Sequence, residues 1–322
     1  MFRAFVLATA SALASVGTAT AQDAGRSNLE SAQAAIGRGD YAEAARQYRM
    51  AADQGNAIGQ NNLGHMYENG FGVPQNHAEA VRWYRMAADQ DLDSGQSNLG
   101  RMYANGRGVP KNDAEAVRWY RMAADQGSAT GQNALGHMYE NGFGVPQNYA
   151  EAVRWYRMAA DKGFYSAQLN LGRMFKDGLG VPQNYAEAAR WFQMAANQGI
   201  AEAQYALGQM YEYGRGVPQN GAEAMRWYRM AADQRFALAQ FGLGQMYLYG
   251  QGVPQNDAEA VRWYRMAADL GFSPAQFSLG EMYRDGRGVP QNYSEAFRWY
   301  RMAADQGHRN ALEVVTFWRH GR

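Results

Sequence analysis

The chain repeats itself with a strict period of 36 residues. Seven of its eight tryptophans and seven of its eight prolines are spaced by that distance, and a Leu-Gly pair keeps the same period. A period of about 20 to 50 residues is typical of solenoids, in which each unit buries its apolar face only against neighbouring units. The sequence therefore predicts seven full repeats over residues 57–308. The periodic tryptophans are Trp83, Trp119, Trp155, Trp191, Trp227, Trp263 and Trp299.

Each repeat is predicted to form two helices joined by a loop. In the first repeat, apolar residues at three- and four-residue spacing predict a helix over residues 57–69, and Gly70 can supply its left-handed C-terminal turn. Asn76 is the predicted N-cap of a second helix, which runs from His77 to about Gln90. The fold class is therefore all-α, an α/α superhelical solenoid of helix-turn-helix repeats.

Residues that recur at fixed places in the repeat predict how the hairpins pack. Gly64 and Ala80 let the two helices approach closely, and Trp83 fills the space between successive hairpins. Met86 and its equivalents are expected to fill the core. Burying one tryptophan contributes at most ~5 kcal/mol of transfer free energy. Seven such anchors can stabilise a chain that has no cysteine and hence no disulfide.

The first 21 residues differ in composition from everything that follows. Arg3 precedes an apolar run, and small residues stand before Gln22, which is the three-part pattern of a secretory signal peptide. We predict a signal peptide over residues 1–21, cleavage after Ala21, and a periplasmic or secreted protein. No later stretch approaches the roughly 18 apolar residues that a transmembrane helix needs, so no transmembrane segment is expected.

Composition argues against several classes of function. The net charge of the chain is +1, and Arg3 is the charged residue of the first segment. The rest of the chain has equal numbers of acidic and basic residues, so no nucleic-acid partner is predicted. The lack of cysteine excludes thiolate nucleophiles and Cys-based zinc sites. The chain has only five histidines, and its serines have no recurrent base partner. The sequence therefore predicts neither an enzyme nor a bound cofactor.

Two histidine–glutamate pairs have a spacing that a metal ion could use. His65 and Glu68 are three residues apart in the first repeat, and His137 and Glu140 occupy the same places in the third. The two repeats are nearly identical throughout, so duplication explains the recurrence. No metal site is predicted.

The repeat resembles the Sel1-like repeat (SLR) family, which is related to the tetratricopeptide repeat but has a longer hairpin loop. The resemblance rests on Ala-x-Gln-x-x-Leu-Gly-x-Met-Tyr, then Gly-Val-Pro, then Arg-Trp-Tyr-Arg-Met-Ala-Ala, over residues 57–308. Residues 22–56 resemble a tetratricopeptide-like capping unit with a tighter loop, Gly37-Arg38-Gly39-Asp40. Residues 309–322 are expected to form a C-terminal capping helix.

The resemblance implies a noncatalytic, monomeric scaffold that binds a protein or peptide in the concave groove of the solenoid. Bacterial members are often exported, and some act in envelope signalling or contact with host cells. A cysteine-rich branch is linked to β-lactam binding, but this chain lacks those cysteines, so that activity is not transferred. The alternative function is binding of glycan or peptidoglycan, for which Tyr213 and Tyr249 could be stacking platforms.

One side of the first helix varies among the repeats, and in repeats five to seven it is rich in aromatic residues. Clustered aromatic residues are common anchors of an interface. The alternative is that residues such as Phe241 pack against the adjacent helix and belong to the core. The predicted protein-binding residues are Tyr205, Gln209, Tyr213, Phe241, Gln245, Leu248, Tyr249, Phe277, Glu281 and Arg284.

Overall fold

The structure, a computed structural model, describes residues 25–320. Within these residues the regular secondary structure is entirely helical, and no helix is long and apolar enough to cross a membrane. The predicted signal peptide and its cleavage point lie outside the described residues.

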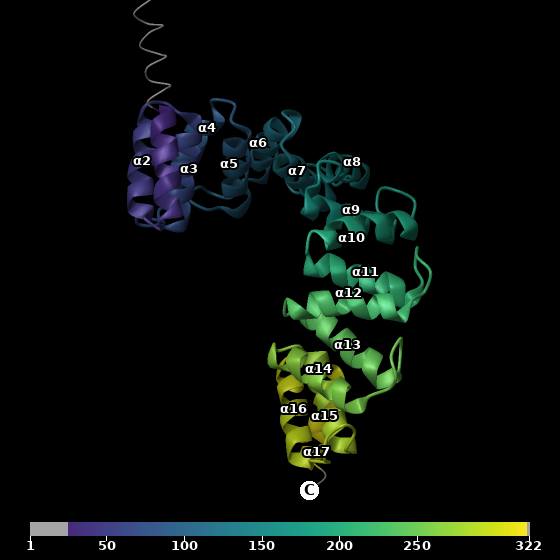
Figure 1. Cartoon of the computed structure of the whole chain (residues 1–322). Helices are drawn as coiled ribbons and strands as arrows, with labels where there is room; N and C mark the ends of the chain where they lie inside the picture. The colour runs from purple at the N-terminus through teal and green to yellow at the C-terminus, as the bar shows by residue number, and fades with distance from the viewer. Residues whose placement is uncertain (1–24, 321–322) are drawn as a thin grey trace, which may run out of the picture. The chain divides into compact units, whose positions relative to one another are not determined.

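The chain divides into two units between Phe164 and Tyr165, which is the border between the third and fourth full repeats. The two units are coloured from purple to teal and from teal through green to yellow in Figure 1. In the first unit, a helix over residues 25–37 precedes α2 (Tyr41–Asp53), α3 (Ala57–Asn69), α4 (His77–Ala88), α5 (Asp93–Asn105), α6 (Asp113–Asp125), α7 (Ala129–Asn141) and α8 (Tyr149–Ala160). The second unit contains α9 (Tyr165–Asp177), α10 (Tyr185–Asn197), α11 (Ala201–Tyr213), α12 (Gly221–Asp233), α13 (Ala237–Tyr249), α14 (Asp257–Asp269), α15 (Ser273–Asp285), α16 (Tyr293–Asp305) and α17 (Arg309–His320).

Within each unit, the two helices of a repeat form a hairpin, and the second helix packs on the first helix of the next repeat. The predicted helix ends are confirmed in the first repeat, apart from the last residues of α4. Gly70 is left-handed, with φ 73°, and Asn76 accepts a hydrogen bond from the backbone N–H of Glu79 at 3.1 Å. These contacts are local, which is why the sequence predicts them.

Glycine allows the close helix packing that the sequence predicts. A Cβ atom on Gly64 would lie 2.8 Å from Cδ1 of the buried Tyr84 on the partner helix. The equivalent glycines of the other repeats face the equivalent aromatic ring in the same way. The aromatic ring of the second helix therefore lies directly on the backbone of the first.

The tryptophans join successive hairpins, as predicted. Trp263 is 4% exposed and belongs to a core cluster with Tyr228 of the preceding repeat and Leu243 of its own repeat. The prediction for Met86 is wrong: it is 37% exposed, because it falls beside the buried stripe of α4. The methionine that fills the core is the one on the first helix, such as Met66.

A buried glutamine links the repeats by hydrogen bonds. Gln204 donates to the carbonyl oxygen of Ala196 at 3.2 Å, and its own Oε1 accepts from Gln234 at 2.9 Å. One repeat later, Leu270 stands in place of Gln234. The buried Oε1 of Gln240 has no hydrogen-bond partner there. A buried acceptor without a partner destabilises the folded state.

We predict that Leu270→Gln stabilises the protein, because the new amide can donate to Gln240. The expected gain in the free energy of unfolding is about 1 kcal/mol. Thermal and urea denaturation of the full chain would measure it. Leu270→Ala is the control, since it removes the same partly exposed apolar side chain without supplying a donor. Equal effects of the two substitutions would contradict this explanation.

Candidate protein-binding surface

The predicted binding residues all lie in the second unit, on α11, α13 and α15. Three of the aromatic residues are packed against other rings of their own repeats. The Phe241 ring centroid lies 5.4 Å from that of Tyr264 in the same repeat and 5.5 Å from that of Phe272, which precedes α15. The equivalent contacts are Tyr205 with Tyr228 and Phe236, and Phe277 with Tyr300 and His308. These three residues are half-buried and pack against aromatic rings of their own repeat, so they present less surface to solvent than the prediction requires.

Tyr213 and Tyr249 are different, because they extend from the last residue of their helices. Tyr213 is 56% exposed and Tyr249 is 66% exposed. Asn69 occupies the same place in the first repeat, where its amide donates to the carbonyl oxygen of His65 at 2.9 Å. Arg215 lies over the Tyr213 ring, 5.5 Å from its centroid. The two tyrosines therefore present large aromatic surfaces to solvent.

The polar residues of the predicted set have separate roles. Gln209 donates to the Tyr205 hydroxyl at 2.9 Å, and Gln245 is half-buried. Arg284 donates to both carboxylate oxygens of Glu281 at 2.8 Å, and the Tyr300 hydroxyl also donates to that carboxylate. Glu281 and Arg284 are therefore paired with each other within repeat seven.

Leu248 does not belong to the surface that the sequence predicts. Its side chain is only 9% exposed and packs in a core cluster with Val261 and Tyr264. The position lies one residue before the exposed Tyr249, so the helix turns it towards the hairpin partner. Leu248 is a correction to the predicted site.

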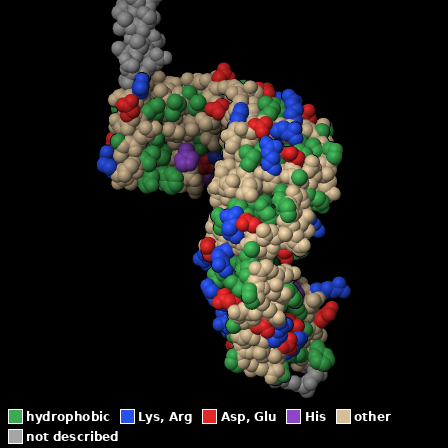
Figure 2. Space-filling view, turned by 45° about the vertical axis from the view of Figure 1, so that its right-hand side comes forward, with side chains coloured by type: hydrophobic (Ala, Val, Ile, Leu, Met, Phe, Trp, Pro, Cys, Tyr) green, Lys and Arg blue, Asp and Glu red, His purple; other side chains and the backbone are tan. Residues whose placement is uncertain are grey.

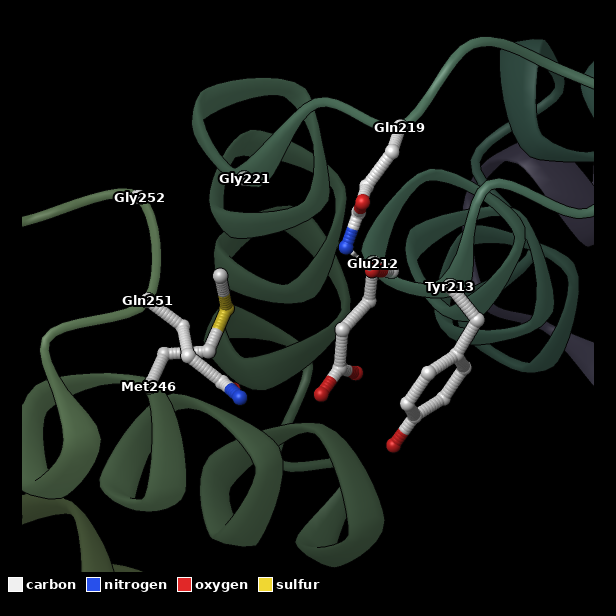
Figure 3. Close-up of a pocket in the computed structure, with 7 residues that line it drawn as sticks. All are labelled: Glu212, Tyr213, Gln219, Gly221, Met246, Gln251 and Gly252. Atoms are coloured by element: carbon white, nitrogen blue, oxygen red, sulfur yellow. Dashed lines mark hydrogen bonds between the residues drawn. The ribbon is translucent and has the colours of Figure 1, made fainter.

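The structure adds Glu212 to the candidate surface, although the sequence did not predict it. Its carboxylate accepts a hydrogen bond from the buried hydroxyl of Tyr228. Burial, reinforced by the Glu212 charge, raises the pKa of Tyr213 above its usual range. Figure 3 shows the Glu212 carboxylate between Met246 and Tyr213, in a pocket of about 400 Å³. The pocket is lined by Glu212, Tyr213, Gln219, Gly221, Met246, Gln251 and Gly252.

A pattern in the sequence could have revealed Glu212. Glutamate recurs at the same place in repeats one, three and five, each time with a tyrosine 16 residues later. In repeat four, Lys176 replaces the glutamate and Phe192, which has no hydroxyl, replaces the tyrosine. Repeats two, six and seven keep the tyrosine without the glutamate, so the glutamate is the residue that marks this hydrogen-bonded pair.

In the first unit the same glutamate also has a cationic partner. Arg101 of repeat two donates to Glu68 of repeat one, with Nη2 and Oε2 2.7 Å apart, and the Tyr84 hydroxyl donates to it at 2.8 Å. Burial raises the pKa of Glu68, but these hydrogen bonds and the Arg101 charge outweigh burial and lower it to about 2. Glu68 therefore stays ionised at neutral pH.

The two histidine–glutamate pairs are engaged in other contacts. Glu68 is occupied by Tyr84 and Arg101, and the His65 ring lies 5.9 Å from Phe71 between centroids. In repeat three, the His137 ring lies 6.0 Å from Phe143 and Glu140 accepts from Tyr156. Over residues 25–320, no group of three or more His, Cys, Asp and Glu side chains is placed to hold a metal ion.

The fold and this surface define a helical-repeat scaffold, whose exposed tyrosines and half-buried carboxylate are suited to binding. The Sel1 repeat family matches eight segments of the chain: residues 33–56, 57–92, 93–128, 129–164, 166–200, 201–236, 237–272 and 273–308. The chain therefore belongs to the Sel1 repeat family. Sel1 repeat proteins generally mediate protein–protein interaction and are generally noncatalytic.

Two solved structures are similar over most of the chain. One is a protective antigen present in uropathogenic Escherichia coli strains that displays an SLR fold, with 36% identity and a TM-score of 0.79. The match covers 92% of this chain and 65% of that protein. The other is a Sel1 repeat protein from Oxalobacter formigenes, with 34% identity, a TM-score of 0.70, and coverage of 92% and 86%. No curated protein sequence matches the chain.

Proposed function

We propose that this protein is an exported, noncatalytic scaffold that binds a partner protein through the tyrosine-bearing helix ends of repeats five and six. The observation that carries the proposal is the exposure of Tyr213 and Tyr249, at 56% and 66%, on helices of adjacent repeats. Tyrosine is enriched in protein interfaces because its rigid ring offers a large contact area together with a polar group. The general role of Sel1 repeat proteins supports the same function.

Export is the second part of the proposal, with a role in envelope signalling or host contact. It is supported by the signal-peptide pattern of residues 1–21. The similar Escherichia coli protein is a protective antigen, and antibodies reach proteins outside the cell. A mature chain that begins at Gln22 would be expected by mass spectrometry. An uncleaved chain in the cytoplasm would contradict export.

The partner's chemical class can be tested with a peptide-display library and an array of glycan and peptidoglycan fragments. We expect the full chain to enrich peptides and to leave the fragments unbound. The double variant Tyr213→Ala/Tyr249→Ala is expected to weaken binding of the enriched peptides by tenfold or more, because it removes both aromatic anchors. Its melting temperature should change little, because both side chains are mainly exposed.

Tyr293→Ala is the matched control. Tyr293 is 57% exposed, close to Tyr213, but lies on α16 in the last repeat. The Tyr293→Ala variant should bind the enriched peptides as strongly as the unaltered chain does. Peptide binding that survives the double variant would contradict the proposed surface. Binding of the fragments that depends on both tyrosines would favour the alternative, a glycan-binding protein.

The surface charge agrees with a specific partner rather than a polyanion. Figure 2 shows acidic and basic side chains interspersed over the visible face. The net charge of the chain is +1. A nucleic acid is attracted by a continuous basic surface. The proposal therefore concerns a protein or peptide.

A further inference from the structure

The first unit shows how this scaffold holds a guanidinium group. Arg101 pairs with both carboxylate oxygens of Glu68, and its Nη2 also lies 3.3 Å from Oδ1 of Asn98. Glu68 is held in place by the Tyr84 hydroxyl at 2.8 Å. The carboxylate belongs to one repeat and the arginine to the next. A bidentate pair of this kind is both strong and directional.

Repeats five and six keep the acceptor half of this arrangement and lack the arginine. Glu212 and Tyr228 are the equivalents of Glu68 and Tyr84, and their hydrogen bond is retained. Gln245 replaces Arg101, and Gly242 replaces Asn98. Among the described residues, no Lys or Arg nitrogen lies within 4.0 Å of the Glu212 carboxylate. A half-buried carboxylate therefore faces the pocket without a cation.

A second local difference lies on the wall of the pocket. Gly221 begins α12, whereas the other second helices begin with a larger residue. Gln251 and Gly252 also line the pocket, and Tyr213 lies at its edge. The volume of about 400 Å³ lies in the range of sites that bind small groups. In the other full repeats, the second helix begins with His77, Asp113, Tyr149, Tyr185, Asp257 or Tyr293 in place of Gly221.

We propose that this pocket binds the guanidinium group of an arginine side chain, which the partner protein supplies in place of the missing intramolecular arginine. The proposal rests on the proposed function, since it names the chemistry of the partner at the same surface. Glu212 would accept two parallel hydrogen bonds, as Glu68 does from Arg101. The Tyr228 hydroxyl positions the carboxylate.

The charged side chains near the pocket do not compete with a guanidinium group for Glu212. Arg215 is a cation beside Tyr213, and it lies over the rings of Tyr213 and Tyr185, 5.5 and 5.9 Å from their centroids. It therefore covers a tyrosine face and leaves the Glu212 carboxylate to the ligand. The equivalent cleft between repeats two and three has Ala104 in place of Glu212 and contains Lys111. That cleft has no carboxylate at the place of Glu212, and the Asp113 carboxylate in its lining is paired with Lys111 at 3.4 Å, so it is an internal control.

Met246 lines the pocket and Met138 lines the cleft between repeats two and three, so their methyl groups report on the two places separately. The full chain, labelled with ¹³C at its methionine methyl groups, would be titrated with N-acetyl-arginine amide and observed by NMR. We expect the Met246 signal to shift in a saturable way and the Met138 signal to stay in place. N-acetyl-lysine amide should bind several-fold more weakly, because an ammonium group cannot form the bidentate pair.

Two substitutions test the carboxylate. Glu212→Gln keeps the shape but loses the charge, and should weaken arginine binding by tenfold or more. Gln245→Arg restores the intramolecular partner seen at Arg101, and should abolish the Met246 response without lowering the melting temperature. Glu202→Gln is the matched control, because it removes an exposed charge from the same helix.

An unchanged response in Glu212→Gln, or equal binding of the lysine derivative, would overturn the proposal. It would also be overturned if the unaltered chain bound library peptides through Tyr213 and Tyr249 but gave no Met246 shift with the arginine derivative. That last result would leave the proposed protein-binding function intact. The arginine-binding proposal and the protein-binding proposal can therefore be contradicted independently.

Discussion

Trp263→Ala is expected to lower the free energy of unfolding by about 3–5 kcal/mol. Trp263 is 4% exposed and packs between Tyr228 of one repeat and Leu243 of the next, so its removal leaves a cavity at the junction of two hairpins. Because its Nε1 has no hydrogen-bond partner, the loss measures packing rather than a broken hydrogen bond. Urea denaturation of the full chain, followed by circular dichroism, would measure the change.

Met266→Ala is the control for this prediction. Met266 lies on the same helix, α14, but is 37% exposed. Substitutions at exposed positions usually change stability by less than about 0.5 kcal/mol. If the two variants lost similar amounts of stability, the tryptophan would not be the anchor between repeats.

Gly216→Ala is expected to lower the free energy of unfolding by about 2–4 kcal/mol, because two costs add. The residue has φ +74°, a left-handed conformation that alanine adopts reluctantly. Its new Cβ would also lie 2.1 Å from the carbonyl oxygen of Tyr185, at the start of α10. Because backbone atoms cannot move aside as a flexible side chain can, the loop that contains Gly216 must move away from the preceding repeat.

Gly214→Ala separates the two costs. Gly214 has φ +65°, but the nearest atom to its new Cβ would be the Gln219 Cβ, at 3.2 Å. This variant should therefore lose only about 1 kcal/mol. Thermal denaturation would compare the variants, and hydrogen exchange would show whether the loop has opened. Equal losses would mean that the contact with Tyr185 contributes nothing.

Local features made most of the fold predictable. The period, the Asn76 cap and the Gly70 turn involve residues within a few positions of each other, and α3 has the predicted bounds Ala57–Asn69. The error at Met86 has a local cause as well. It stands next to a buried stripe, and spacing alone cannot locate the edge of such a stripe to one residue.

The candidate site was only partly predictable, because exposure depends on the neighbouring repeat. Phe241 and Tyr249 looked alike in the sequence, since both are aromatic and both vary among repeats. In the structure, Phe241 is covered by Tyr264 and Phe272, whereas Tyr249 is 66% exposed. Glu212 was missed because its importance comes from Tyr228 on α12 and from Gln245 on α13, which replaces an arginine.

The sequence by itself determined the repeat, the two helices in each unit, the caps and the tryptophan anchors, because each follows from short-range spacing or from recurrence. Only the tertiary structure decided which variable side chains face solvent and which carboxylate faces a pocket. Those properties depend on how α11, α12 and α13 stack, and stacking brings together residues that lie about one repeat apart. Tyr213 and Glu212 are adjacent in the sequence, yet one is an exposed ring and the other is half-buried against Tyr228.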